Sequence, residues 1–262
     1  MSVDAKVTEA LLEGGQILRL TLDAPKGNVL DTEMIGGLTA ALRRHDLPGL
    51  KAILFEGQGP NFSFGASVPE HTKAEVSRML PAFHDLFRAL QKMNVPTFAA
   101  VRGRCLGGGL ELAAYCSWIF ASPDATLGQP EIKLAVFPPM ASLLLPWRLG
   151  GARAVDLCVS GRTIGAEEAH RIGLVHAIAD DPAAAAIAFA REHLFGTSSL
   201  SLRYAERAAR LGLSRQFEEA LPALERLYLT ELMETPDANE GIAAFLERRA
   251  PRWEADADKD SA

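Results

Sequence analysis

The sequence predicts an α/β protein followed by a helical C-terminal part. Up to about Pro182, short apolar runs alternate with segments whose apolar residues recur every three to four positions, which is the element order of a parallel sheet with right-handed connections. After Pro182 only the helical spacing recurs. We therefore predict a core with the active site at residues 1–195 and a helical subdomain at residues 196–262.

The N-terminal elements follow from alternation and turn residues. Residues 17–22 alternate apolar and polar side chains, and residues 23–27 end this strand with a Pro-Lys-Gly turn. Thr32 is the expected cap of a helix that reaches about Arg44. Further elements are expected as buried strands at 51–55 and 97–101 and as a helix at 75–93.

The C-terminal part is expected to contain four helices and a frayed polar tail. The tail, residues 254–262, is acidic and carries no apolar pattern. The helices are expected near 182–195, 198–212, 214–233 and 236–249.

The composition excludes several classes of protein. The chain has 262 residues, of which 48% are hydrophobic, and a formal net charge of −6. This charge gives no basic surface for nucleic acid, and the even spread of apolar residues is unlike that of a disordered chain. There is no run of about 20 apolar residues to cross a membrane.

The expected location is the cytoplasm. Residues 1–7 carry polar and acidic side chains without the apolar stretch of a signal peptide. The three cysteines, Cys105, Cys116 and Cys158, are an odd number without the close spacing of a zinc ribbon or a redox pair. They are expected to be free thiols in a reducing compartment.

The most informative segment is the run of three glycines at residues 107–109. It follows the strand that ends near Val101, and an amphipathic helix is expected to begin near Leu110. The glycines serve either a tight turn with close helix packing or a close approach of backbone N–H groups and the helix dipole to a ligand. Dinucleotide binding is disfavoured because the G-x-G-x-x-G spacing and a Walker A sequence are absent.

Two carboxylates accompany this segment. Glu111 lies in the first turn of the expected helix, and Glu131 follows 20 residues later in a Gly-Gln-Pro-Glu turn. Addition of water to an enoyl thioester needs one group that accepts a proton and another that donates one. Sequence spacing does not show that the two side chains meet, and a structural role is the better interpretation of either glutamate taken alone.

The glycine and glutamate motifs together resemble the enoyl-CoA hydratase/isomerase (crotonase) family. The likeness extends over essentially the whole chain. It is carried by Gly-Gly-Gly-Leu-Glu-Leu-Ala at 107–113, Gly-Gln-Pro-Glu at 128–131, Asn-Phe-Ser-Phe-Gly-Ala-Ser at 61–67, and the segments 157–175 and 240–249.

The resemblance implies a fold, an assembly and a mechanism. The family folds as a spiral of ββα units whose C-terminal helices pack in trimers, which often pair into hexamers. Ala66 and Gly108 would supply the two N–H groups of an oxyanion hole for the thioester oxygen. Glu111 would activate water and Glu131 would protonate carbon. Because isomerases and thioesterases of the family often keep only one of these carboxylates, the pair favours a hydratase.

The substrate would be an acyl-CoA thioester, with coenzyme A as part of the substrate and with no cofactor or metal. Lys26 and Gly27 resemble the coenzyme A-binding segment of the family. Arg249 or Arg252 would reach the ligand of a neighbouring subunit. For each of these cations a solvated surface position is an equally good interpretation.

Departures from the family pattern concern the acyl pocket. Ser67 stands where the family usually has aspartate, beside the oxyanion hole. Phe137, Pro138, Met140 and Leu143 replace a glycine-rich stretch and would suit a compact ring, although they could equally pack the core. His71 and His84 could lie near this pocket, but lone histidines on helices are more often structural.

These features are similar to those of cyclohexa-1,5-diene-1-carbonyl-CoA hydratases of anaerobic aromatic degradation. Such an enzyme would place the hydroxyl on the β carbon and the proton at the far end of the diene. Two alternatives remain open at this point: an ordinary 2-enoyl-CoA hydratase of fatty-acid oxidation, and a noncatalytic crotonase-like binding protein.

Overall fold

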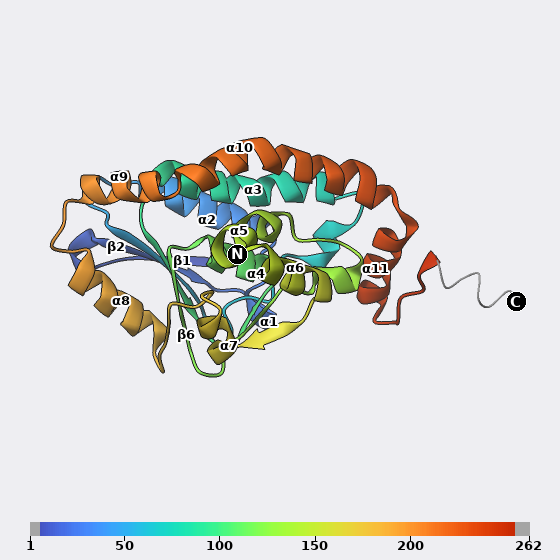
Figure 1. Cartoon of the computed structure of the whole chain (residues 1–262), viewed down its shortest axis with the longest axis horizontal. Coiled ribbons are helices and arrows are strands. Elements are labelled where there is room, and N and C mark those ends of the chain that lie inside the picture. The colour runs from blue at the N-terminus through green and yellow to red at the C-terminus, as the bar shows by residue number, and fades with distance from the viewer. Residues whose placement is uncertain (1–5, 255–262) are drawn as a thin grey trace, which may run out of the picture.

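A computed structural model describes residues 6–254 and confirms the predicted α/β organisation (Figure 1). The main sheet has six strands in the order β1-β2-β3-β4-β6-β9. β1 is antiparallel to β2, and every other pair in this sheet is parallel. The strands are β1 (Val7–Leu12), β2 (Ile17–Leu22), β3 (Ala52–Gly57), β4 (Thr97–Val101), β6 (Trp118–Ala121) and β9 (Ala177–Ile178).

Helices cover both faces of this sheet, which is why its central strands are almost entirely apolar. All five residues of β4 are buried. One face packs against α2 (Thr32–Arg44) and α3 (Val76–Met93). The other face packs Leu54 and Phe98 against Ala186 and Ala190 of α8 (Pro182–His193). The sheet is therefore a rigid, doubly covered platform.

The helix α2 begins as predicted, but its cap is different. The side chain of Asp31 accepts a hydrogen bond of 2.9 Å from the N–H of Met34, so the prediction that Thr32 caps the helix is wrong. The hydroxyl of Thr32 instead donates to Glu70. Asp31 carries an acceptor with the reach that the cap requires and adds negative charge at the positive helix end.

A second layer of short elements follows β4, and its strands were not predicted. Its three strands form a separate sheet in the order β5-β7-β8. Each of these strands has only three residues, too few for an alternating pattern to stand out. The layer contains β5 (Arg104–Leu106), α4 (Gly108–Tyr115), β7 (Thr126–Gly128), a 3-10 turn at Pro130–Leu134, α5 (Pro139–Leu149), α6 (Gly151–Ser160), β8 (Thr163–Gly165) and α7 (Ala166–Arg171).

The C-terminal part is helical from residue 182, as predicted. After α8 it contains α9 (Ser199–Ala209), α10 (Leu211–Arg226) and α11 (Pro236–Glu247). α10 lies along α3 and α5, and α11 packs against the 3-10 turn 130–134. The division at residue 195 stays a prediction, and most of the expected frayed tail lies outside the described residues.

The contact between α11 and the turn 130–134 requires glycine at position 241. A Cβ atom at Gly241 would lie 2.3 Å from the carbonyl oxygen of Leu134. The backbone of the C-terminal helix therefore touches the backbone of the turn that carries Glu131.

We predict that Gly241→Ala lowers the free energy of unfolding by about 1–3 kcal/mol, because the added methyl group has to push two backbone segments apart. Gly212→Ala is the matched control, since nothing lies within 4 Å of a Cβ atom at Gly212 in α10. That change should leave stability equal or raise it by roughly 0.5–1 kcal/mol. Urea denaturation followed by circular dichroism tests both, and equal stability of the two variants would contradict this account.

Candidate active site

The three glycines of residues 107–109 allow three segments to meet. Gly107 has φ 50° and ψ −128°, and a Cβ atom there would lie 2.6 Å from Oε1 of Glu131. A Cβ atom at Gly108 would lie 3.1 Å from the backbone nitrogen of Ala66, and one at Gly109 would lie 2.6 Å from Cβ of Ser63. The close-packing interpretation of the glycine run is therefore confirmed, and the approach of the backbone to a ligand stays a prediction.

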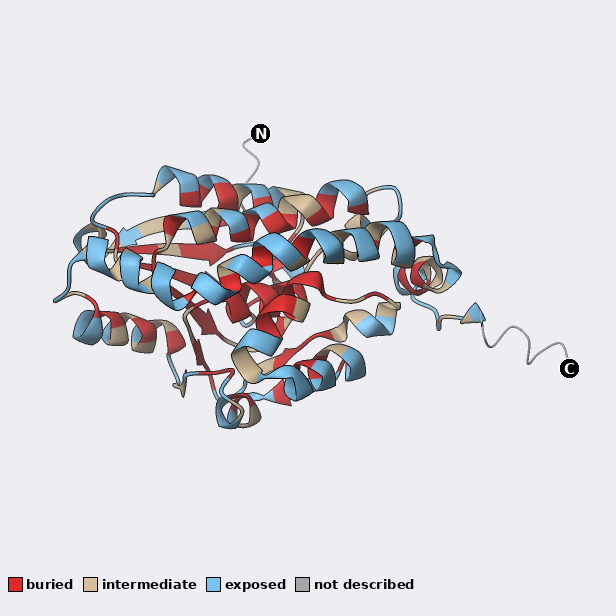
Figure 2. Ribbon diagram, turned by 45° about the horizontal axis from the view of Figure 1, so that its top comes forward, coloured by how far each residue is buried: buried red, intermediate tan, exposed pale blue. Residues whose placement is uncertain are grey.

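The helix that follows the glycines is a core helix. All eight residues of α4 are buried, and Figure 2 shows buried segments gathered at the centre of the molecule. The prediction that this helix is amphipathic is therefore wrong, because α4 has no exposed face. The helix begins at Gly108, two residues before the predicted start near Leu110. It carries the side chain of Glu111 into the interior.

The two predicted carboxylates face one inner chamber. Glu111 is only 4% exposed, and Glu131 reaches the chamber from the 3-10 turn 130–134. The chamber has a volume of about 20 Å³, and a water molecule needs roughly 10–15 Å³ of such space. The two carboxyl groups are thus held around a space of about one water molecule.

Burial keeps protons on this pair at neutral pH. Burial raises the pKa of Glu111 to about 7, while hydrogen bonds from the N–H groups of Ala141, at 2.8 Å, and of Met140 lower it. Burial, and after it the charge of Glu111, raises the pKa of Glu131 well above its ordinary value. Because two adjacent carboxylates repel, the pair favours one ionised and one protonated group near neutrality.

Gln129 is a site residue that sequence reasoning did not single out. Its side chain is fully buried, and with the amide nitrogen turned towards Glu131 it donates to both carboxyl oxygens, at 3.1 and 3.0 Å. The amide fixes the orientation of Glu131. The signal was present in the Gly-Gln-Pro-Glu turn, but a glutamine in a turn is not by itself a sign of burial.

The predicted N–H groups of Ala66 and Gly108 are adjacent and free. Leu30 pairs with the segment around Ala66 by donating to the carbonyl of Gly65 and accepting from the N–H of Ser67, so the N–H of Ala66 points away from Leu30. Gly108 is the first residue of α4, where an N–H group has no partner within the helix. Within residues 6–254, neither group donates to a protein acceptor.

A larger outer cavity of about 440 Å³ adjoins the inner chamber. Ala66, His71 and Glu131 line both. Most of the lining is apolar, and it is drawn from the loop around residue 65, the turn 130–134 and α11. The remaining members are Phe64, Gly65, Val68, Leu106, Gly107, Pro130, Lys133, Leu134, Val136, Gly241, Ala244, Phe245, Arg249 and Pro251.

Cations surround the outer cavity, and only some were predicted. Lys133 lines it, and the guanidinium of Arg104 lies 5.6 Å from the ring centre of Phe64. Lys26 lies in the turn α1 (Pro25–Asn28), which packs under the same phenylalanine, because a Cβ atom at Gly27 would lie 2.6 Å from that ring. Sequence analysis missed Arg104 and Lys133, which belong to no motif.

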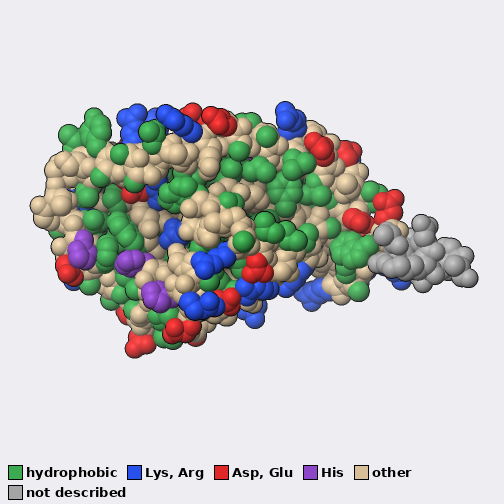
Figure 3. Space-filling view, viewed as in Figure 1, with side chains coloured by type: hydrophobic (Ala, Val, Ile, Leu, Met, Phe, Trp, Pro, Cys, Tyr) green, Lys and Arg blue, Asp and Glu red, His purple; other side chains and the backbone are tan. Residues whose placement is uncertain are grey.

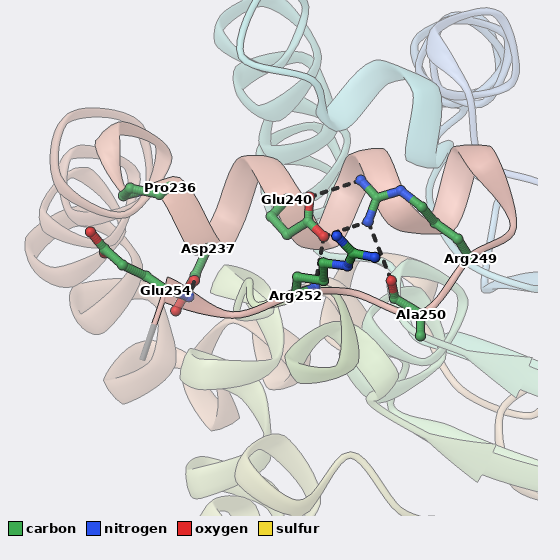
Figure 4. Close-up of a pocket in the computed structure, with 7 residues that line it drawn as sticks. All are labelled: Pro236, Asp237, Glu240, Arg249, Ala250, Arg252 and Glu254. Atoms are coloured by element: carbon green, nitrogen blue, oxygen red, sulfur yellow. Dashed lines mark hydrogen bonds and ion pairs between the residues drawn. The ribbon is translucent and has the colours of Figure 1, made fainter. Parts of the chain in front are cut away.

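Arg249 also reaches the outer cavity, but its charge is balanced within the chain. Glu240 binds the guanidinium of Arg249 and the backbone N–H of Arg252 (Figure 4). Glu247 adds a second ion pair to Arg249. The expected role of Arg249 or Arg252 towards the ligand of a neighbouring subunit stays a prediction.

The predicted acyl-pocket residues divide into two groups. Phe137 and Pro138 line the inner chamber. Met140 and Leu143 are buried in the core, and Met140 acts on the site through its backbone N–H to Glu111. The binding roles of Phe137, Pro138 and Met140 stay predictions.

Of the polar residues expected near the acyl pocket, only His71 lines a cavity. His71 lines both cavities, and its Nδ1 donates to the carbonyl of Ser67 at 2.8 Å. Ser67 lines neither cavity, and its predicted contact with substrate stays a prediction. His84 is fully buried in α3 against Glu225, which lies 2.6 Å away, and lines neither cavity.

The sequence of most of the chain matches one family model. The model described as enoyl-CoA hydratase/isomerase matches residues 13–256. The chain belongs to this family. A cyclohexa-1,5-dienecarbonyl-CoA hydratase of Thauera aromatica is 49% identical over 241 residues, which cover 92% of this chain and 93% of the relative. A probable enoyl-CoA hydratase of Mycobacterium leprae is 38% identical over 260 residues, covering 95% and 98%.

Solved structures of the family confirm the predicted crotonase-like fold. An enoyl-CoA hydratase from Mycobacterium avium superposes with a TM-score of 0.84 at 27% identity, covering 96% of this chain and 100% of that one. An enoyl-CoA hydratase/isomerase from Xanthobacter autotrophicus gives a TM-score of 0.83 at 29% identity, covering 92% and 93%.

Within residues 6–254, no three His, Cys, Asp or Glu side chains gather as a metal ion would need. None of the helices in that range is both long and apolar enough to cross a bilayer.

The raised pKa of Glu111 predicts how stability depends on pH. Because the folded-state pKa of about 7 exceeds the ordinary value of 4.5, the contribution of Glu111 is fully present below about pH 4.5 and is lost as the pH rises through about 7. Glu111→Gln keeps an acceptor for Ala141 but cannot ionise. From about pH 5 to about pH 8, the variant should therefore gain on the order of 1–3 kcal/mol relative to the native protein.

Urea denaturation at the two pH values measures this difference. Glu219→Gln is the control, because Glu219 is exposed on α10. If the free energies of unfolding of the native protein and of Glu111→Gln differ by the same amount at both pH values, Glu111 does not titrate as described.

Proposed function

We propose that this protein is a hydro-lyase that adds water to an α,β-unsaturated acyl-CoA thioester. The observation that carries the proposal is the inner chamber. Two buried carboxyl groups face a space of about one water molecule, beside the free N–H groups of Ala66 and Gly108. This arrangement offers a proton acceptor, a proton donor and an oxyanion site within one enclosure.

The thioester oxygen would lie against Ala66 and Gly108 at the junction of the two cavities. Both donors are backbone groups, and Gly108 opens α4, so the positive end of the helix dipole faces the same point. These groups stabilise the negative charge that develops on the oxygen during attack. One such donor typically lowers a barrier by roughly 3–4 kcal/mol.

Two proton transfers accompany the addition of water. Glu111, ionised, accepts a proton from water while the water oxygen bonds to the β carbon and the electrons of the double bond move to the thioester oxygen. Glu131, protonated, then gives its proton to carbon as the enolate collapses. The pair ends with its protonation states exchanged and returns by proton exchange. No electron leaves the substrate, so we propose that the reaction needs no redox cofactor and no metal.

We propose an alicyclic dienoyl thioester, cyclohexa-1,5-diene-1-carbonyl-CoA, as the substrate. The 49% identity to the Thauera aromatica enzyme, against 38% to the Mycobacterium leprae relative, supports this choice. Phe137 and Pro138 give the chamber stiff apolar walls. A six-membered ring exceeds about 20 Å³, so it would remain in the outer cavity with its reacting edge towards the carboxyl groups. The proton would then go to the far end of the diene.

The coenzyme A part of the substrate requires local cations, because the chain carries a net charge of −6. Lys133, Arg104 and Lys26 lie around the outer cavity. None of the three forms an ion pair with another residue in the range 6–254. We propose that they receive the phosphates.

We also propose that the chain forms trimers, alone or paired as hexamers, in the cytoplasm. Hydrophobic side chains gather between charged ones on the face in Figure 3, and exposed apolar patches mark contact surfaces. Free thiols at all three cysteines suit a reducing compartment. The exposed large hydrophobic residues on α6, α9 and α10 are Val155, Val159, Leu200, Tyr204 and Leu211.

The substrate proposal predicts a preference in turnover. Purified protein should hydrate cyclohexa-1,5-diene-1-carbonyl-CoA with a kcat/KM at least about tenfold above that for crotonyl-CoA, because a six-membered ring buries more apolar surface in the outer cavity than a four-carbon chain does. Product mass, followed by mass spectrometry, should rise by one water. Efficient hydration of crotonyl-CoA alone would instead establish the ordinary 2-enoyl-CoA hydratase.

The mechanism predicts that each carboxyl group is needed. Glu111→Gln and Glu131→Gln should each lower kcat roughly 10²–10⁴-fold, the usual contribution of a general acid or base, while Glu219→Gln stays at the native value. Full activity of both chamber variants would show that hydration does not use this pair and takes place at a different site.

A further inference from the structure

Tyr228 has a buried hydroxyl group without a partner. The residue is 1% exposed, and no group within residues 6–254 forms a hydrogen bond with its oxygen. A buried hydroxyl left unpaired costs free energy, which is why such groups are rare in folded proteins. A phenylalanine would fill the same space without this cost, so the hydroxyl calls for an explanation outside folding.

The same tyrosine lines the inner chamber. It faces the space that Glu111 and Glu131 share, and its ring packs edge-on against Phe137 with the ring centres 5.3 Å apart. Burial, together with the charges of the two glutamates, raises the pKa of Tyr228. The hydroxyl therefore keeps its proton at any physiological pH and can act only as a neutral hydrogen-bonding group.

A local irregularity of the chain sets the position of this side chain. Directly after α10, residues Leu227–Glu231 form a π-helical turn, and a 3-10 turn follows at Leu232–Glu234. A π turn is wider than an α turn and changes the side from which the following residues project, and such turns are frequent at functional sites. The C-terminal part thus contributes a polar group to a chamber whose carboxyl groups come from the core.

We propose that the hydroxyl of Tyr228 donates a hydrogen bond to the oxygen atom that the enzyme adds, first in the attacking water and then in the hydroxyl group of the product. This inference rests on the proposed hydratase function. The water needs one lone pair for the β carbon and turns its hydrogens towards the carboxyl groups. Its second lone pair is left for Tyr228, which fixes the direction of attack without transferring a proton.

The proposal predicts that Tyr228→Phe loses activity without losing stability. Tyr228→Phe should lower kcat by about 10–100-fold, the usual range for losing a hydrogen bond in a polar site, and should change KM by less than about threefold. Its melting temperature should equal or exceed the native value, because an unpaired buried hydroxyl is removed. Tyr115→Phe is the matched control, since Tyr115 is also buried but lines neither cavity, and it should keep native kcat.

Ligand binding provides a second readout that a structural role would not change. Tyr228→Phe should weaken binding of the hydroxylated product thioester by about tenfold, and should bind cyclohexane-carbonyl-CoA, which lacks the hydroxyl, as tightly as the native protein does. Calorimetry measures both. Equal loss for the two ligands, a native kcat in the variant, or a fall in melting temperature in step with kcat would each overturn the proposal.

The native protein separates this inference from the proposed function. If it hydrates none of the unsaturated thioesters, the function itself fails. If it hydrates them and Tyr228→Phe is unimpaired, only the role of Tyr228 fails.

Discussion

The burial of two carboxyl groups beside one another is the constraint on which the structure depends. Neither group can ionise freely in such a place, since burial and mutual repulsion both favour the neutral form. The chain offsets this with donors at fixed positions: backbone N–H groups of Ala141 and Met140 for Glu111, and the amide of Gln129 for Glu131. The result is a pair of acids with protons available near neutral pH. The same arrangement makes the protein less stable as the pH rises, which is the thermodynamic consequence of keeping acid chemistry in the interior.

Close backbone approach is what brings the parts of the site together. The glycines at 107–109 let the start of α4 touch the segments around Ser63, Ala66 and Glu131. At the other end of the turn 130–134, Gly241 lets α11 touch Leu134. The turn that carries Glu131 is therefore held between the core and the C-terminal helices. The C-terminal part is therefore a component of the site. It also supplies Tyr228 to the inner chamber and several residues of the outer cavity.

The two cavities divide the work of the proposed enzyme. The inner chamber has room for about one water molecule and holds the acidic groups, whereas the outer cavity is about 440 Å³, mostly apolar and surrounded by cations. Recognition of the coenzyme A thioester and addition of water are thus separated by a few residues that line both spaces, Ala66, His71 and Glu131. These shared residues sit where the thioester oxygen is expected, so a thioester bound there would have its reacting carbons beside the chamber.

The sequence by itself determined the strands β2, β3 and β4, the helices α2 and α3, the helical C-terminal part and the family, and it singled out Ala66, Gly108, Glu111 and Glu131, because periodicity and short motifs are local properties. It did not reveal β1, β6 or β9. It did not determine that α4 is buried on all sides, or that Asp31 rather than Thr32 caps α2, since both depend on what packs nearby. Only the tertiary structure brought the two glutamates, 20 residues apart, to one chamber, and only it added Gln129, Arg104, Lys133 and Tyr228. The physical reason is that burial and hydrogen-bond pairing depend on segments that are distant in sequence. Tyr228 shows this: in the sequence it is one residue of a helical stretch, whereas in the fold the π turn and the contact with Phe137 place its hydroxyl beside the carboxyl groups.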